Sequence, residues 1–158
     1  RVILELSHGL FIMEIICQDE ESLADFARQI SKKILPGSIV FLQGDLGVGK
    51  TTFVRKYLLA LGFKGHVKSP TYSIVESYQL SQIQVAHFDL YRLSDGEELE
   101  YMGFREYLDA QSICFIEWPE KASGFLPEAD MVISLEYHQQ GRIIKVDDDS
   151  TIDYSGNS

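Results

Sequence analysis

The chain has 158 residues, which suits one domain, and 45% apolar with 24% charged residues is typical of a soluble globular protein. The formal net charge of −10 excludes a general basic surface that grips the RNA or DNA backbone. No apolar run reaches the ~18 residues of a membrane helix, so we expect no membrane contact. Cys17 and Cys114 are the only cysteines, and both lie in apolar runs that predict buried thiols. With the lack of a secretory signal, they predict a cytoplasmic protein.

The first half of the chain alternates strand and helix patterns. Residues 11–17 predict a strand, and the following helix starts at a cap, Asp19, and carries an apolar stripe to Ile34. Residues 38–43 form a short, continuously apolar run, which is typical of a buried parallel strand. A glycine-rich loop comes next, and apolar residues then recur at helical spacing from Phe53 to Leu61.

The second half adds more strands than helices. Residues 71–80 and 83–91 predict a hairpin, 94–109 a helix with a break at Gly103, and 112–118 a buried strand. Residues 129–138 and 141–148 predict two further strands around a turn. The alternation predicts one α/β domain over residues 1–158, with a mostly parallel central sheet and antiparallel additions. We interpret residues 1–12 as an N-terminal extension and 147–158 as a flexible acidic tail.

The glycine-rich loop matches the pattern G-x-x-x-x-G-K-[ST] through Gly44, Gly49, Lys50 and Thr51. Such a match arises by chance about once in 200 chains of this length, from average residue frequencies. Glycines permit positive φ angles, so successive N–H groups can point inward at a phosphate, and the next helix adds its positive N-terminus. The loop therefore predicts binding of ATP or ADP with Mg²⁺, with Lys50 at the β- and γ-phosphates and Thr51 at the metal.

Two acids end predicted strands and are candidates for the second half of the site. Glu117 closes the buried strand at 112–118, and Asp89 closes the preceding strand. Ligands bind at this end of the strands in open α/β sheets, so either acid could hold Mg²⁺ or orient an attacking water. The alternative is a helix cap or a salt bridge, for which Arg92 lies close to Asp89.

Two further features stay open on the residues alone. Pro70 restrains its neighbours, so Ser69 and Thr71 present hydroxyls on a stiff loop that is either a nucleotide-sensing switch or an ordinary turn. Trp118 follows Glu117 directly and belongs either to the core or to a lid or partner contact.

Five segments together resemble one known family. "GDLGVGKTTF", "VKSPTYSIVESY", "HFDLYRL", "EELEYMGFREY" and "ICFIEWPEK" occur in the order and spacing of the bacterial TsaE (YjeE) family. The resemblance covers about Met13 to Tyr137 and implies a P-loop NTPase-like three-layer domain. It also implies an ATPase needed for the N6-threonylcarbamoyladenosine (t6A37) modification of tRNAs that read codons starting with A.

The resemblance also implies roles for residues. Leu46 to Thr51 would wrap the ATP phosphates, Thr51 and Glu117 would hold Mg²⁺, and adenine would lie near Glu20. Ser69 and Thr71 would form a switch-like element. The implied catalytic residues are Lys50, Asp89 and Glu117, and the implied nucleotide-binding residues are Glu20, Asp45, Leu46, Gly47, Val48, Gly49, Lys50, Thr51, Thr52 and Trp118.

The family resemblance implies TsaB and TsaD as partners, with tRNA reached only indirectly through their complex. A competing hypothesis is a small-molecule P-loop kinase, but a kinase needs arginines in a lid, and Arg55, Arg92 and Arg105 are dispersed. A third is an ATP-dependent binding module with no catalytic role of its own.

Overall fold

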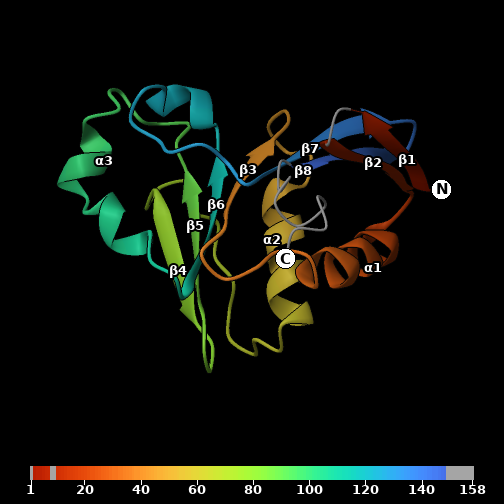
Figure 1. Cartoon of the computed structure of the whole chain (residues 1–158), viewed down its shortest axis with the longest axis horizontal. Coiled ribbons are helices and arrows are strands. Elements are labelled where there is room, and N and C mark those ends of the chain that lie inside the picture. Colours follow the sequence, from red (N-terminus) through yellow and green to blue (C-terminus); the bar gives the residue numbers. More distant parts are fainter. Residues whose placement is uncertain (1, 8–9, 149–158) are drawn as a thin grey trace.

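The computed structural model describes residues 2–7 and 10–148, which form one sheet with helices on both of its faces (Figure 1). The strand order is β1-β2-β8-β7-β3-β6-β5-β4. The strands are β1 (Val2–Ser7), β2 (Leu10–Cys17), β3 (Ile39–Gln43), β4 (Val75–Gln79), β5 (Gln84–Asp89), β6 (Ser112–Glu117), β7 (Met131–His138) and β8 (Gly141–Asp148). The helices are α1 (Glu20–Ser31), α2 (Lys50–Ala60), α3 (Glu98–Tyr101) and two 3₁₀ turns, η1 (Phe104–Tyr107) and η2 (Pro119–Ala122).

The centre of the sheet is parallel and its two sides are antiparallel. β7, β3, β6 and β5 pair in parallel, whereas β4 joins β5, and β8 joins both β7 and β2, in antiparallel register. The predicted α/β architecture is therefore confirmed. Parallel pairing brings the carboxyl ends of β3, β5 and β6 to one edge, where α2 also begins.

The two faces of the sheet bury separate apolar clusters. On β5 and β6, Val85 and Phe115 pack with residues of α1 and α2. Their neighbours Ala86 and Ile116 belong to the other cluster, which contains Leu99 of α3. Because side chains alternate along a strand, the odd-numbered residues of β5 and β6 face α2. This alternation decides which polar residues meet the loop before α2.

The helix at the start of the described core is capped as its sequence predicts. The Ser22 amide donates to Asp19 Oδ1 at 2.8 Å, and the Asp19 backbone N–H donates to the Ser22 hydroxyl at 3.2 Å. Two backbone N–H groups that have no partner within the helix are thereby hydrogen-bonded. Leu23, Phe26 and Ile30 then form the buried stripe. The predicted cap and apolar face of α1 are both confirmed.

One prediction of local structure was confirmed in part and another was wrong. The helix predicted over 94–109 is reduced to the short α3 and η1, but its predicted break at Gly103 is confirmed, because this glycine takes a left-handed conformation (φ 73°) and turns the chain between buried Leu99 and Phe104. β4 starts at Val75, four residues later than predicted, because the Ile74 amide donates to the Pro70 carbonyl and closes a turn at residues 70–74.

The chain ends differ from the sequence interpretation in two respects. β1, in the segment interpreted as an extension, pairs with β2 as an edge strand that the sequence analysis did not assign. At the other end Asp147 and Asp148 belong to β8, and the rest of the predicted tail lies outside the described residues.

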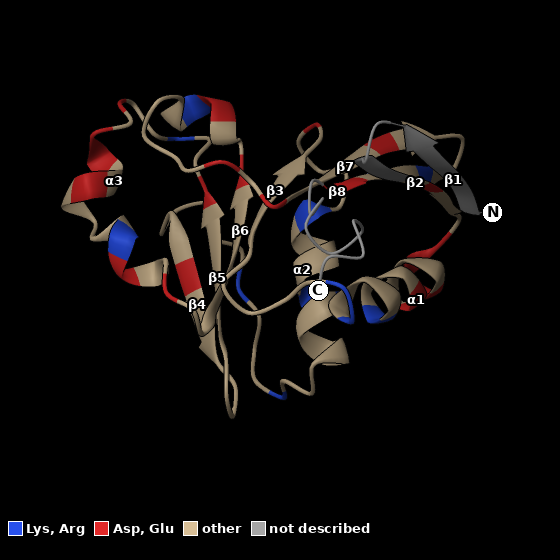
Figure 2. Ribbon diagram, viewed as in Figure 1, with Lys and Arg blue, Asp and Glu red and all other residues tan. Residues whose placement is uncertain are grey.

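Charge is unevenly distributed over the fold (Figure 2). Acidic residues gather on α3 and near the ends of β5 and β6, whereas α2 and the loop after it carry lysines and arginines. In the part of the chain that the structure describes, no helix has the length and apolar character needed to cross a membrane.

Candidate functional site

The loop between β3 and α2 has the backbone that its glycines predict. Gly44, Gly47 and Gly49 take φ angles of 145°, 76° and 121°. At Gly44 a Cβ would lie 2.5 Å from the Leu135 carbonyl oxygen and 2.8 Å from Val48 Cγ1. A side chain at this position would therefore collide with β7 as well as strain the backbone. Both effects explain why the motif begins with glycine.

Lys50 is buried at the start of α2, and its ammonium group turns back toward the loop. Nζ donates to the carbonyl of Gly44 and, at 3.5 Å, to that of Asp45. It also lies 3.9 Å from Glu117 Oε1 and 4.3 Å from the ring centre of Trp118. Burial lowers the pKa of Lys50, and the nearby charge of Glu117 opposes that shift. Lys50 is thus held by neutral carbonyls, one carboxylate and one aromatic face.

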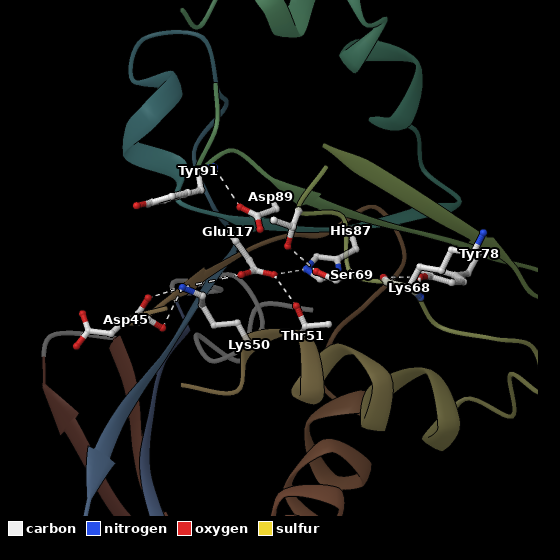
Figure 3. A network of polar contacts seen from close by, with 12 residues as sticks. Asp45, Lys50, Thr51, Lys68, Ser69, Tyr78, His87, Asp89, Tyr91 and Glu117 are labelled. Carbon is white, nitrogen blue, oxygen red and sulfur yellow. Dashed lines mark hydrogen bonds and ion pairs between the residues drawn. The ribbon is translucent and has the colours of Figure 1, made fainter. Parts of the chain in front are cut away.

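Glu117 contacts three residues of the site (Figure 3). Lys50 and Thr51 were predicted from the sequence, and His87 was not. Glu117 Oε2 accepts from the Thr51 hydroxyl at 3.4 Å and contacts His87 Nε2 at 2.5 Å, while Oε1 faces Lys50. Glu117 is 3% exposed, so these contacts replace the water that an acid normally keeps. The sheet register places it here, because Glu117 ends β6 on the α2 face.

Asp89 lies beside Glu117, since the two residues are register partners on β5 and β6. Its Oδ1 accepts a hydrogen bond from the Tyr91 amide at 3.0 Å. Burial raises the pKa of Asp89, and the charge of Glu117 raises it further. No described contact joins Asp89 to Arg92, whose guanidinium lies over the ring of Tyr72 instead. The salt-bridge alternative for Asp89 is therefore not realised among the described residues.

The Ser69–Thr71 loop reaches the same pocket. Its two hydroxyls hydrogen-bond each other at 2.7 Å, and both residues line a pocket together with Thr51, Asp89 and Glu117. The predicted loop, acids and hydroxyls thus converge around one hollow at the carboxyl edge of the sheet.

Two residues with strained backbones contact or directly follow residues that line this hollow, Ile74 through Asp89 and Trp118 after Glu117. Ile74 (φ 70°) and Trp118 (φ 56°) take positive φ angles that are uncommon for such side chains. The Ile74 carbonyl accepts the Asp89 amide, so the strained turn after Thr71 is tied directly to β5. Strain of this kind concentrates at functional sites, where the surrounding structure maintains it.

The other predicted residues lie on the two flanks of the loop. Glu20 shares a second pocket with Gly47, Val48, Gly49 and Thr52, and its carboxylate pairs with Lys56 at 3.2 Å. Asp45 and Trp118 line a third pocket with Lys50. Glu20 is thus near the predicted phosphate position but separated from the acidic pair.

Three residues that support the site are not indicated by any sequence motif. His87 contacts Glu117, and the only available signal was its place two residues before Asp89, on the same strand face. On the other flank, Arg142 Nε donates to the Val48 carbonyl at 2.6 Å, and the Tyr137 hydroxyl donates to the Leu46 carbonyl at 3.3 Å. The β7–β8 hairpin therefore hydrogen-bonds to the backbone of the glycine-rich loop, and no local sequence pattern indicates these contacts.

A parallel-centred sheet, a glycine-rich loop leading into α2, and an acid at the end of the neighbouring strand define a protein of P-loop-like fold. Comparison with known proteins narrows this class. The family model "Threonylcarbamoyl adenosine biosynthesis protein TsaE" matches residues 17–144. The chain belongs to the TsaE family.

Individual relatives agree. The chain is 46% identical over 133 residues to the tRNA threonylcarbamoyladenosine biosynthesis protein TsaE of Haemophilus influenzae, covering 81% of this chain and 84% of that one. It is 37% identical over 101 residues to the protein of the same name from Bacillus subtilis, covering 64% of this chain and 63% of that one. The crystal structure of Bacillus subtilis YdiB superposes with a TM-score of 0.76 at 25% identity, over 92% of this chain and 91% of that one.

Proposed function

We propose that the protein binds ATP with Mg²⁺ at the Gly44–Thr52 loop and hydrolyses it, as an accessory protein of tRNA threonylcarbamoyladenosine (t6A37) synthesis that acts on a TsaB–TsaD complex. The observation that carries the proposal is the convergence on Glu117 of Lys50 and Thr51 from the loop, with Asp89 beside it. An isolated glycine-rich turn would not need two buried acids and a buried lysine at its mouth.

The residues present fit Mg²⁺ as the metal. Two neighbouring ligands of an octahedral Mg²⁺ lie about 3 Å apart, and Thr51 Oγ1 and Glu117 Oε2 are 3.4 Å apart. Among the described residues no three acidic, histidine or cysteine side chains cluster into a metal cage. Mg²⁺ keeps several waters and phosphate oxygens as ligands, so one hydroxyl and one carboxylate suit it. When bound, the metal neutralises charge that develops on the phosphates.

Each residue has a distinct role in this proposal. The loop N–H groups and the N-terminus of α2 bind phosphate, and Lys50 exchanges its carbonyl partners for phosphate oxygens. Asp89, next to Glu117, orients the attacking water. Ser69 and Thr71 contact the outermost phosphate as a switch-like loop. The nucleoside extends along the loop toward the pocket at Glu20.

The negative net charge favours a protein partner over tRNA. At −10 the chain repels a polyanion, so tRNA is reached only through the partner complex. We expect the isolated protein to bind ATP–Mg²⁺ and to bind tRNA weakly, as measured by filter binding at physiological salt. Tight, salt-resistant tRNA binding by the chain alone would contradict this part of the proposal.

The decisive experiment measures ATP consumption by the purified protein alone, with TsaB–TsaD, and with candidate small-molecule acceptors. Stimulation by the protein pair supports the accessory ATPase. Phosphate that appears on a metabolite would identify a kinase instead, and ATP binding without turnover in any mixture would identify a binding module.

Two variants test the site itself. Lys50→Ala should weaken ATP binding by about 10- to 100-fold, the value of one or two charge-assisted hydrogen bonds. Glu117→Ala should weaken the Mg²⁺ dependence of hydrolysis. If Glu117→Ala hydrolysed ATP with an unchanged Mg²⁺ requirement, the metal assignment would be wrong.

A further inference from the structure

His87 is a completely buried polar residue in the centre of the sheet. It lies on β5, is 0% exposed, and its Nε2 contacts Glu117 Oε2 at 2.5 Å. A carboxylate only accepts hydrogen bonds, so Nε2 carries the proton in this contact. The other ring nitrogen, Nδ1, is buried and has no hydrogen-bond partner among the described residues.

This arrangement is unfavourable for a residue that only fills space. A buried nitrogen without a partner forfeits its hydration, and an apolar side chain of similar volume would avoid that loss. His87 nevertheless stands between Val85 of one apolar cluster and Asp89. Its one polar contact is to the acid to which we assign Mg²⁺.

The contacts of Glu117 are divided between its two oxygens. Oε1 faces Lys50 at 3.9 Å, and Oε2 faces both His87 and Thr51. A buried lysine attracts a buried carboxylate strongly, so without a competing donor the carboxylate would rotate to pair both oxygens with Lys50. The His87 N–H opposes that rotation.

We propose that His87 is a positioning residue that holds Glu117 Oε2 beside Thr51 Oγ1, in the orientation that receives Mg²⁺, and away from full pairing with Lys50. The inference rests on the proposed function, because it assigns Mg²⁺ to Thr51 and Glu117. Residues that orient a metal ligand from behind typically change metal affinity by about 10- to 100-fold when they are removed. The loss should be larger with Mg²⁺ than without it, because His87 acts on the carboxylate that receives the metal and is not among the residues that line the pocket at the loop.

The experiment uses the full chain and its only tryptophan, Trp118, as a fluorescent reporter of the site. ADP is titrated with Mg²⁺ and, separately, with EDTA, and the ratio of the two affinities is compared among variants. We expect His87→Leu to lower this ratio by about 10- to 100-fold. His87→Gln should restore it, because its amide nitrogen can occupy nearly the position of Nε2.

A matched control separates positioning from packing. Phe88 is also fully buried on β5 but faces the opposite cluster, against the rings of Phe104 and Tyr107. Phe88→Leu should lower stability to urea and leave the affinity ratio unchanged. If His87→Leu fails to fold, His87→Asn replaces it, because asparagine is too short to place a donor at Glu117.

Three outcomes would overturn the inference. One is a wild-type ratio in His87→Leu or His87→Asn, another is an equal loss in Phe88→Leu, and the third is failure of His87→Gln to restore the ratio. If the wild-type protein itself bound ADP equally with and without Mg²⁺, the proposed metal site would fall first, and the role of His87 with it. The wild-type titration therefore distinguishes the two failures.

Discussion

The two sides of the candidate site are built in opposite ways. The glycine-rich loop between β3 and α2 is one continuous segment, and its shape comes from three glycines with positive φ. The acidic side is assembled from His87, Asp89 and Glu117, which come from two strands and meet only through the β5–β6 register. The loop is defined by backbone conformation and close packing, whereas the acidic side is a group of buried ionisable side chains.

The two sides therefore make opposite contributions to the stability of the fold. The glycines of the loop permit its positive φ angles and its close packing against β7, so replacing them should destabilise the fold. Asp89 is buried with a raised pKa, so its charge opposes folding, as expected for residues kept for function. Substitutions on the two sides should therefore have opposite effects on stability.

Gly44→Ala should damage the loop most. The added Cβ meets the Leu135 carbonyl at 2.5 Å in a conformation with φ 145°, so we expect a loss of about 3 kcal/mol and no measurable ATP binding. Urea unfolding and nucleotide titration measure the two effects. The control is Gly62→Ala, where φ is 89° but no heavy atom lies within 4 Å, which should cost about 1 kcal/mol and retain binding. Equal losses in both variants would show that close approach to β7 does not matter.

Asp89→Asn should show the opposite pattern. We expect ATP hydrolysis to fall by about 100- to 10,000-fold, because a charged, water-orienting group is lost. Stability at neutral pH should rise, because the amide keeps an acceptor for the Tyr91 amide but carries no buried charge.

The stability difference between Asp89→Asn and the wild type should depend on pH. The pKa of Asp89 in the folded protein lies above its ordinary value of 3.8, so the folded state binds the proton more tightly. The wild type therefore loses stability as pH rises from about 3.8 through the folded pKa, and the advantage of the Asn variant should appear over that window. Urea unfolding at a series of pH values measures it. An advantage that grows toward acid pH would contradict the assignment.

Arg142→Gln tests the support that the hairpin gives to the loop. It removes a charged donor to the Val48 carbonyl at 2.6 Å and the contact over the Tyr137 ring. We expect a stability loss of about 1.5–3 kcal/mol and weaker nucleotide binding, because the loop loses a partly buried hydrogen bond from a charged donor. Differential scanning calorimetry and ADP titration provide the measurements, and unchanged ADP affinity would separate the hairpin from the function of the loop.

Tyr137→Phe is the smallest change on the same hairpin. It removes the hydroxyl that donates to the Leu46 carbonyl at 3.3 Å but keeps the ring under the Arg142 guanidinium. Because Tyr137 is half exposed, water can replace the lost donor, and we expect less than about 1 kcal/mol by urea unfolding. A loss as large as that of Arg142→Gln would mean that the Tyr137 hydroxyl supports the loop as strongly as the Arg142 guanidinium does.

The sequence by itself determined the features whose geometry is local. The spacing of Gly44, Gly49, Lys50 and Thr51 predicts the loop, because positive φ angles and a helix start follow from adjacent residues. Asp19 predicts the cap of α1 for the same reason. Asp89 and Glu117 could be selected as strand ends, and parallel strands place such ends at one edge.

Only the tertiary structure decided which side chains touch. The 28- to 30-residue separations that join His87 and Asp89 to Glu117 are closed by strand register, and the 91- and 94-residue separations that tie the β7–β8 hairpin to the loop are closed by packing. The same holds for the lengths of the helical segments on either side of the predicted break at Gly103, where only the short α3 and η1 form and Leu99 and Phe104 are both buried. Local sequence specifies backbone conformation, but pairing between distant strands depends on the free energy of the whole core.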